Sequence, residues 1–278
     1  MVPKILEFTM PSFSRKMWVS DQAREIWMKK FVQFAECWRQ IEWLTVANGI
    51  RSCALFFISQ QELAGLALVL RKLGLKTVVV SAHIQADQRQ NSLCFRTVAG
   101  RAKDLRAFCK AWKLGDDETM GRLLGYPPCC RSFFHRVFVQ EGLTDCIWPM
   151  GSSASESPSD AQTIYVNSIP ELNPFWIAVG IRLVPHYACR FDCPKAASFA
   201  REFIAVGNEA GYGTFMETAL EVLQWPVEWS CLHGIVEIRT PILKISQQSD
   251  FTRSKLTINL LSRSFPKEGA AGLCVAPD

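Results

Sequence analysis

The sequence predicts an α/β protein, with a small mixed or parallel sheet flanked by helices and a helix-rich C-terminal half that carries a cysteine site. Two short apolar runs, 52–59 and 76–83, are separated by a segment of helical pattern. This strand–helix–strand order is typical of parallel α/β units. In the C-terminal half, helical patterns over 195–206 and 213–223 outnumber the one strand pattern over 234–246. Hydrophobic residues make up 49% of the chain and charged residues 21%, as in a packed globular protein.

The first elements follow from apolar spacing and capping residues. We expect a long amphipathic helix over 20–48, capped by Ser20 or Asp21. Its apolar face comprises Ile26, Trp27, Phe31, Phe34, Trp38 and Ile41. The segment 60–73 is a second expected helix, which Gly74 ends.

Three more elements are expected before the first cysteine motif. The run 93–98 is a third candidate strand, and 103–114 has a helical pattern. Asp116 or Asp117 can cap a short helix, which Gly125 ends.

The C-terminal half contains weaker signals. Residues 151–162 are small, polar and without periodicity, which indicates a flexible loop or a subdomain boundary. Residues 174–183 are apolar enough for a buried helix or strand, and Pro241 requires a break or an edge position in the expected strand over 234–246. We therefore divide the chain into an N-terminal α/β part over 1–150, a linker over 151–163, a C-terminal part over 164–263 and a loose tail over 264–278.

Charge and hydropathy bound the functional class. The net charge of +5 comes from scattered basic residues without a dense Lys/Arg block, so nucleic-acid binding is not indicated. No apolar run reaches the roughly 18 residues that span a bilayer, and the N-terminus lacks the apolar core of a signal peptide. These features favour a cytoplasmic location. In a reducing compartment, the eleven cysteines are expected to be buried, metal-bound or catalytic rather than disulfide-paired.

Two cysteine segments carry the main functional prediction. The first reads Gly-Tyr-Pro-Pro-Cys-Cys and ends at Cys129 and Cys130, and the second reads His-Tyr-Ala-Cys-Arg-Phe-Asp-Cys-Pro and contains Cys189 and Cys193. In each segment a proline beside the cysteines is expected to start a helix, whose free amides and dipole favour thiolate over thiol. Because four thiolates suit zinc or an iron–sulfur cluster, we expect these cysteines to hold one metal centre.

The spacing leaves the role of each ligand open. Cys129 and Cys130 are not expected to point the same way without an irregular backbone, so one could bind the metal while the other packs or resolves a disulfide. The spacing between Cys189 and Cys193 is wider than that of a zinc knuckle, which indicates a loop that curls around the centre. His186 could serve as a ligand, a proton donor or an orienting group.

Eight further residues are candidates for a pocket beside the centre. They are Tyr126, Arg182, Arg190, Trp229, Cys231, His233, Glu237 and Arg239. Cys231 and His233 alternate as on a strand and could reach a metal or line a substrate pocket, although an aromatic-rich core turn is the simpler explanation. Glu237 and Arg239 share a strand face. A surface ion pair is the simpler explanation of this pattern, and binding of a carboxylate substrate by Arg239 is the alternative.

The two segments resemble a motif pair of a poorly characterised prokaryotic family of the domain-of-unknown-function type. There the motifs read approximately Gly-Tyr-Pro-x-Cys-Cys-x-x-Phe-Phe and His-x-x-Cys-x-x-x-Cys. In this chain the resemblance covers about Leu124 to Phe203. It implies a cysteine-ligated iron–sulfur centre and supplies no reaction.

Three functional hypotheses follow. The favoured one is an iron–sulfur protein with a 4Fe–4S cluster, whose open iron would make it a lyase or transferase of small-molecule biosynthesis or sulfur transfer, with His186 as the acid/base candidate. The second is a structural zinc protein that acts as a partner-binding subunit. The third is a thiol-redox enzyme that uses Cys129 and Cys130. The expected partners are a small-molecule substrate, a protein partner or a second copy of the chain, and no membrane.

Overall fold

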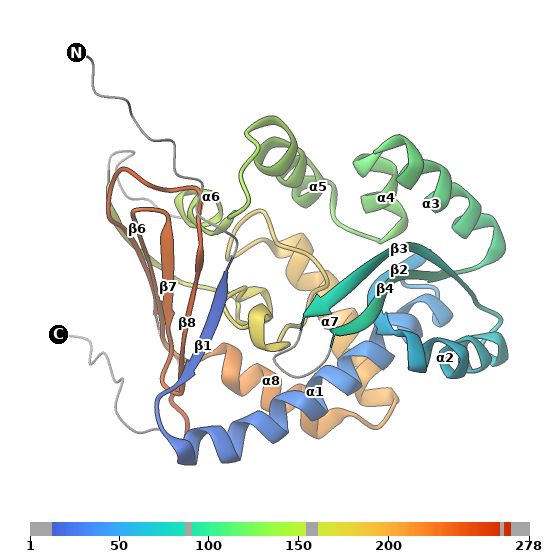
Figure 1. Ribbon diagram of the computed structural model, residues 1–278, viewed down its shortest axis with the longest axis horizontal. Helices are drawn as coiled ribbons and strands as arrows, with labels where there is room; N and C mark the ends of the chain where they lie inside the picture. The colour runs from blue at the N-terminus through green and yellow to red at the C-terminus, as the bar shows by residue number, and fades with distance from the viewer. Residues whose placement is uncertain (1–12, 87–90, 154–160, 262–263, 268–278) are drawn as a thin grey trace.

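The computed structural model describes residues 13–86, 91–153, 161–261 and 264–267. They form an α/β fold in which a six-stranded sheet lies at one end and a three-stranded sheet toward the other, with helices between the sheets and beyond the smaller one (Figure 1). The helices are α1 Asp21–Ala47, α2 Gln60–Lys72, α3 Ala102–Leu114, α4 Asp117–Leu123, α5 Pro128–Phe134, α6 Ile147–Ser152, α7 Pro194–Glu209 and α8 Gly213–Leu223, with π-helical residues His135–Gln140 and 3-10 turns Pro170–Leu172 and Ile177–Val179. The strands are β1 Ser14–Trp18, β2 Cys53–Ser59, β3 Lys76–Ala86, β4 Asn91–Gly100, β5 Thr163–Val166, β6 Val227–Leu232, β7 Ile235–Arg239, β8 Leu243–Gln248 and β9 Leu256–Leu260.

The long helix α1 forms as its apolar spacing predicts. The side chain of Ser20 caps it by accepting a hydrogen bond from an amide of the first turn at 3.0 Å. Trp27, Phe34 and Trp38 are buried on one face, and α1 packs against α7. The helix predicted over 20–48 is therefore confirmed.

The three-stranded sheet has the order β2-β4-β3, and both pairs are antiparallel. The predicted parallel pairing of its first two strands is wrong. Only residues 87–90 separate β3 from β4, and so short a connection requires adjacent antiparallel strands. As a result β4 lies between the two predicted partners, with Val98 opposite both Leu55 and Val78.

The six-stranded sheet has the order β1-β8-β7-β6-β9-β5 and is mixed, because β5 pairs with β9 in parallel. Five of its strands follow residue 162, so the prediction of a helix-rich C-terminal half is wrong. Strand alternation is clear in β6, where Val227, Trp229 and Cys231 are buried and their neighbours are not. The strand predicted over 234–246 is the hairpin β7–β8, which breaks around Pro241.

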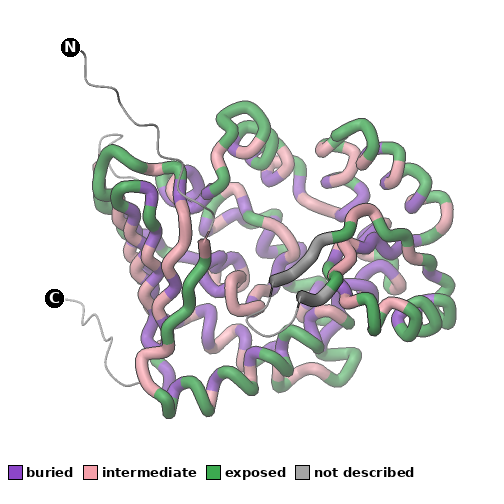
Figure 2. The backbone as a smooth tube through the Cα atoms, viewed as in Figure 1, coloured by how far each residue is buried: buried purple, intermediate pink, exposed green. Residues whose placement is uncertain are grey.

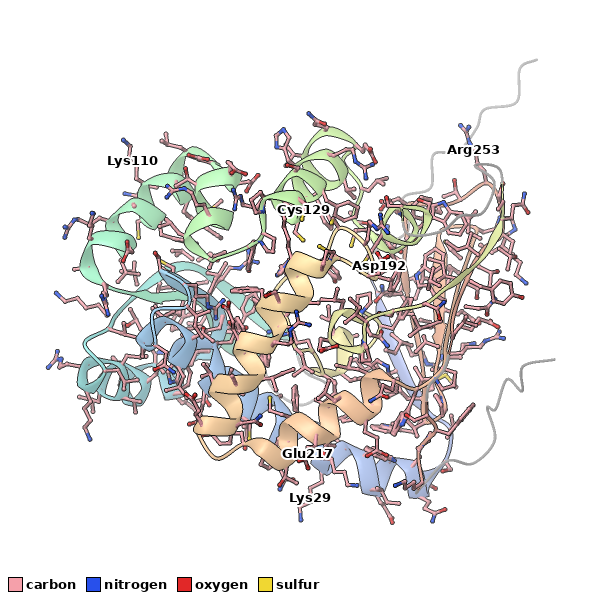
Figure 3. The ribbon with its side chains drawn as sticks, turned by 180° about the vertical axis from the view of Figure 1, so that it is seen from behind. Lys29, Lys110, Cys129, Asp192, Glu217 and Arg253 are labelled. Carbon is pink, nitrogen blue, oxygen red and sulfur yellow. The ribbon has the colours of Figure 1, made fainter. Side chains whose placement is uncertain are left out.

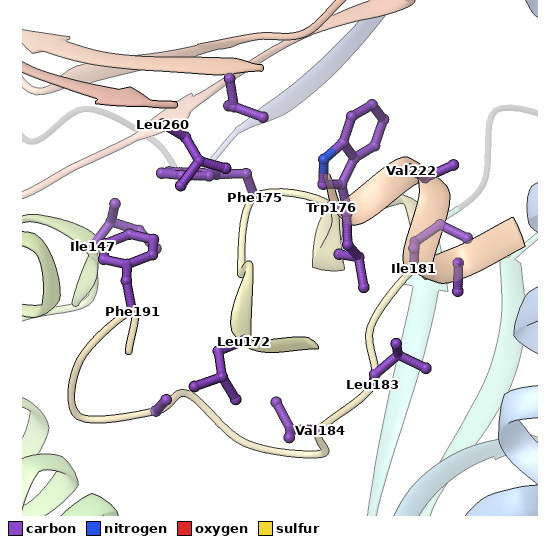
Figure 4. Close-up of a cluster of buried hydrophobic side chains, with 14 of the residues drawn as sticks. Ile147, Leu172, Phe175, Trp176, Ile181, Leu183, Val184, Phe191, Val222 and Leu260 are labelled. Carbon is purple, nitrogen blue, oxygen red and sulfur yellow. The ribbon is translucent and has the colours of Figure 1, made fainter. Parts of the chain in front are cut away.

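Residues 174–183 form neither a regular helix nor a strand, contrary to the prediction. Beyond the 3-10 turn Ile177–Val179 the segment is irregular, and Gly180 adopts a φ of 90° at the end of that turn. Figure 4 shows Phe175 and Trp176 within the hydrophobic core, where both are almost fully buried. The apolar content of this segment thus reflects burial and not a repeating element.

The predicted linker and tail lie only partly within the described residues. α6 extends to Ser152, and residues 154–160 of the linker are outside the described residues. In the tail, residues 264–267 have no regular structure, and residues 268–278 are outside the described residues.

The largest hydrophobic core lies between the helices and the six-stranded sheet, where buried segments concentrate (Figure 2). It contains residues from both sides of the predicted linker, such as Phe34, Phe203 and Trp229. Two smaller clusters include residues of the three-stranded sheet. Among the described residues, no helix has the length and apolar character needed to cross a membrane.

Candidate metal centre

The four cysteines of the two segments converge at one point. Figure 3 labels one of them, Cys129, near the start of α7. Cys129 and Cys130 lie in the first turn of α5, Cys189 lies in the loop before α7, and Cys193 is the N-cap residue of α7. All four Sγ atoms lie within 4.8 Å of one another. The Sγ atom of Cys193 is 3.7 Å from that of Cys129 and 4.0 Å from that of Cys130. The structure therefore shows a four-cysteine group that could bind a metal.

Both adjacent cysteines face the group from a regular helical turn. The Sγ atoms of Cys129 and Cys130 lie 4.0 Å apart, and both residues belong to α5. The expectation that an irregular backbone would be needed is wrong. Side chains in a first helical turn lean toward the N-terminal end, and the group lies at that end of α5.

Prolines and one glycine position the two segments. Pro128 and Pro194 occupy the first positions of α5 and α7, where a missing amide hydrogen is tolerated. Gly125 has a φ of 79°, and a Cβ atom built there would lie 2.9 Å from Cβ of Arg51. The turn between α4 and α5 can therefore lie directly against Arg51, two residues before β2.

Backbone amides stabilise negative charge on the sulfurs. Cys189 N–H donates to Cys130 Sγ, and Ala196 N–H in the first turn of α7 donates to Cys193 Sγ. Burial raises the pKa of Cys130, and it raises that of Cys189 to about 12. Burial also acts to raise the pKa of Cys193, but the Ala196 amide and the neighbouring thiols outweigh it and lower that pKa. In the metal-free group, Cys193 is thus the favoured thiolate.

The sulfur separations can be compared with those of two kinds of metal site. Four thiolates at about 2.3 Å from zinc stand about 3.8 Å from one another. In a 4Fe–4S cluster each thiolate binds a different iron, which places the sulfurs about 6 Å apart. The separations among Cys129, Cys130 and Cys193 are 3.7, 4.0 and 4.0 Å, close to the first value, and all four Sγ atoms lie within 4.8 Å of one another. The four-cysteine group is therefore consistent with a metal ion or a cluster, and the separations among these three cysteines are nearer those of a single ion.

His186 lies outside this group of mutually close ligand atoms. Its imidazole stacks on the ring of Tyr126 with centroids 4.7 Å apart, and it contacts the ring of Phe199 at 6.0 Å. Both imidazole nitrogens are buried and have no hydrogen-bond partner among the described residues. Burial, helped by the charge of Arg51, lowers the pKa of His186 to about 3, so the ring is neutral.

Two of the other candidates are arginines engaged in ion pairs. Arg182 Nη2 lies 3.7 Å from a carboxylate oxygen of Glu42. Arg190 forms two hydrogen bonds to Asp192, at 2.8 and 2.7 Å, close to the cysteine loop and largely in solvent. Arg182 therefore reaches a buried partner, and Arg190 does not.

The remaining candidates belong to the six-stranded sheet. Trp229 and Cys231 are buried in its core, and the Cys231 thiol donates to a backbone carbonyl at 3.2 Å. His233 is exposed in the turn between β6 and β7, with a φ of 51°. Arg239 Nη2 lies 3.0 Å from a carboxylate oxygen of Glu237 in a half-exposed ion pair. None of these residues belongs to the cysteine group.

The sequence did not reveal a buried ion pair between Glu42 and Arg51. Only 2% of the Glu42 side chain and none of the Arg51 side chain is exposed. One signal was available: Glu42 lies on the apolar face of α1, four residues after Trp38, whose indole N–H donates to it at 2.9 Å. An acid at such a position requires a buried partner.

Comparison with known proteins returned no match to a family model, a curated protein or a solved structure. The resemblance of the two cysteine motifs to a prokaryotic family therefore stays a prediction.

Proposed function

We propose that Cys129, Cys130, Cys189 and Cys193 bind one zinc ion with a structural role. The observation that carries the proposal is the spacing of 3.7–4.0 Å among the sulfurs of Cys129, Cys130 and Cys193, with all four sulfurs within 4.8 Å, which suits one tetrahedral ion better than a cluster. Zinc with four thiolate ligands has no open position for a substrate. The ion would therefore serve the fold and not a reaction.

The zinc ion would join distant parts of the chain. Between Cys129 and Cys193, which are 64 residues apart, the chain contains the irregular residues 174–191. A cross-link at this site would hold that stretch between α5 and α7. A protein whose only metal is structural would function by binding another molecule. We therefore include a protein partner or a second copy of the chain in the proposal.

The second candidate is the iron–sulfur enzyme that the motif resemblance implies. The solvent exposure of the cysteine group supports this candidate. Cys129 and Cys189 are only partly buried, so one side of the group meets solvent. An iron held by three thiolates would keep one position open for a substrate there. The sulfur spacing favours zinc over this candidate.

Metal analysis of the full chain separates the candidates. The protein is purified without oxygen, and its zinc, iron, sulfide and visible spectrum are measured. We expect one zinc per chain and no visible absorption. Stoichiometric iron and sulfide in a brown protein would support the second candidate, and a metal-free protein with reactive thiols would support a thiol-redox enzyme.

A cysteine substitution tests the ligands. Cys193→Ser is expected to abolish zinc binding, because serine is a poor zinc ligand. Cys109→Ser is the matched control, since Cys109 is a partly buried cysteine of α3 outside the group. Full zinc content in Cys193→Ser would contradict the proposed ligand set.

A further inference from the structure

A second polar cluster lies next to the metal centre. Tyr126 and His186 each stand three residues before the first cysteine of their segment, and their rings stack with centroids 4.7 Å apart. The charge of Arg51 acts on both rings. We call this set, completed by Glu42 and Arg182, the polar cluster. It combines residues of α1, the connection between α1 and β2, the irregular stretch before the second cysteine segment, and both cysteine segments.

The guanidinium of Arg51 is fixed in place. Its Nε donates to Thr45 Oγ1 at 2.8 Å, and its Nη2 donates to the backbone carbonyl of Glu42 at 2.6 Å and to the Glu42 carboxylate. The group also lies 4.8 Å from the ring centroid of Phe203. Its Nη1, in contrast, is buried without a partner among the described residues. Arg51 thus presents two N–H groups in a set direction.

Three more nitrogens of the polar cluster are buried without a hydrogen-bond partner among the described residues. They are Arg182 Nε and both ring nitrogens of His186. A buried donor without a partner destabilises the fold, so several in one place indicate a missing polar ligand. Phe199 connects the groups, since its ring contacts those of His186 and of Phe203, on which Arg51 lies.

The polar cluster is also short of negative charge. The Glu42 carboxylate is the shared partner of Arg51, Arg182 and the indole N–H of Trp38. Two guanidinium groups therefore face one carboxylate, and the neutral His186 adds no charge. The side chain of Arg182 is 34% exposed, so solvent reaches the cluster at that point. A single small anion would balance this charge.

We propose that the polar cluster binds a small carboxylate that carries a neighbouring hydroxyl or amino group. Arg51 Nη1 offers two N–H groups, Arg182 Nε one and neutral His186 one. A carboxylate accepts about four hydrogen bonds, which matches these donors. The second imidazole nitrogen is an acceptor and suits the neighbouring hydroxyl or amino group. This binding site lies beyond the zinc site and does not depend on which metal the cysteines hold.

Calorimetric titration of the full chain, with its metal as purified, tests the site. The probes are acetate, glycolate and inorganic phosphate. We expect one site per chain for acetate and glycolate, with tighter binding of glycolate because its hydroxyl reaches His186. Arg182→Gln and His186→Phe, which keeps a stacking ring, are each expected to weaken glycolate binding at least tenfold. Arg39→Gln removes a partly exposed arginine of α1 paired with Glu62 and should leave binding unchanged.

Folding and metal content are checked for each variant by circular dichroism and elemental analysis. If Arg182→Gln does not fold, Arg182→Lys keeps the charge, lacks Nε and is expected to weaken binding as well. A carboxylate-dependent rise in the melting temperature of the unmodified protein gives a readout that needs no variant. No binding of either carboxylate at millimolar concentration, binding of phosphate alone, or equal affinity in the folded Arg182 variants would overturn the proposal. These outcomes leave the zinc content, and so the proposed zinc site, unaffected.

Discussion

The Sγ atoms of Cys129 and Cys193 lie 3.7 Å apart, although 64 residues separate them in the sequence. Their contact brings the start of α5 to the start of α7. It also aligns the two segments that supply the stacked rings of Tyr126 and His186. The cysteine group and two members of the polar cluster, Tyr126 and His186, therefore come from the same two segments.

Metal removal is expected to destabilise the fold. A cross-link that closes a loop of 64 residues restricts the unfolded chain and contributes about 4 kcal/mol. Urea unfolding with and without a zinc chelator measures the loss as a lower midpoint. Cys193→Ser is the control, because a chelator should have no further effect on it. If the chelator leaves the urea midpoint of the unmodified protein unchanged, metal binding by the cysteine group does not stabilise the fold.

The stability of the protein is expected to depend on the protonation of Asp145. This residue precedes α6, where its carboxylate accepts hydrogen bonds from the Ile147 amide and the Ser249 hydroxyl. Burial raises the pKa of Asp145 to about 6 from an ordinary 3.8, so the folded state binds the proton more tightly than the unfolded state. Ionisation of Asp145 therefore destabilises the fold as pH rises from about 4 to about 6.

Asp145→Asn removes this effect and keeps the hydrogen-bond geometry. Between pH 4.5 and pH 7, the variant should gain about 2 kcal/mol in free energy of unfolding relative to the unmodified protein. Denaturant titrations at the two pH values measure the difference. Asp117→Asn, at a partly exposed residue at the start of α4, is the control and should follow the unmodified protein. Parallel pH profiles for both variants would contradict this account of Asp145.

Loss of the buried acid should be costly. Glu42→Gln leaves the guanidinium of Arg51 buried without its counter-charge, and we expect a loss of about 3–5 kcal/mol. Glu141→Gln breaks an exposed pair with Arg136 and should cost less than about 1 kcal/mol. Chemical denaturation compares the two. Equal effects would mean that the polar cluster is hydrated and not enclosed.

Gly125 should tolerate no side chain. An alanine Cβ there would lie 2.9 Å from Cβ of Arg51 and 3.1 Å from the Phe199 ring, at a φ of 79°. Gly74 has a similar φ of 71° but no atom within 4 Å of the built Cβ, so Gly74→Ala isolates the backbone strain. We expect Gly125→Ala to lose at least about 1–3 kcal/mol more than Gly74→Ala. Thermal melts that rank the two variants equally would exclude the close packing described here.

The local elements of the first half could be predicted because their signals are local. Ser20 and Asp116 cap α1 and α4 as expected, with side chains that accept amide hydrogen bonds. The four cysteines could be placed together because their chemistry is shared. Strand pairing could not be predicted, since β4 takes a position between β2 and β3 that only the tertiary fold specifies.

The six-stranded sheet could not be predicted from the sequence, for two physical reasons. β1, β5 and β9 are short, and their pairing partners are distant, with Ser14 opposite Gln247 and Thr163 opposite Thr257. The polar cluster escaped prediction because Glu42, Arg51 and Arg182 are typical surface residues in composition, and only packing shows that the first two are buried.

Zinc K-edge X-ray absorption of the purified full chain tests the central claim most directly, because it counts the atoms bound to the metal. We predict four sulfur neighbours at about 2.3 Å and no second metal nearby. Nitrogen or oxygen in the first coordination shell, or an iron edge with iron–iron scattering in place of zinc, would contradict a mononuclear site of four thiolates.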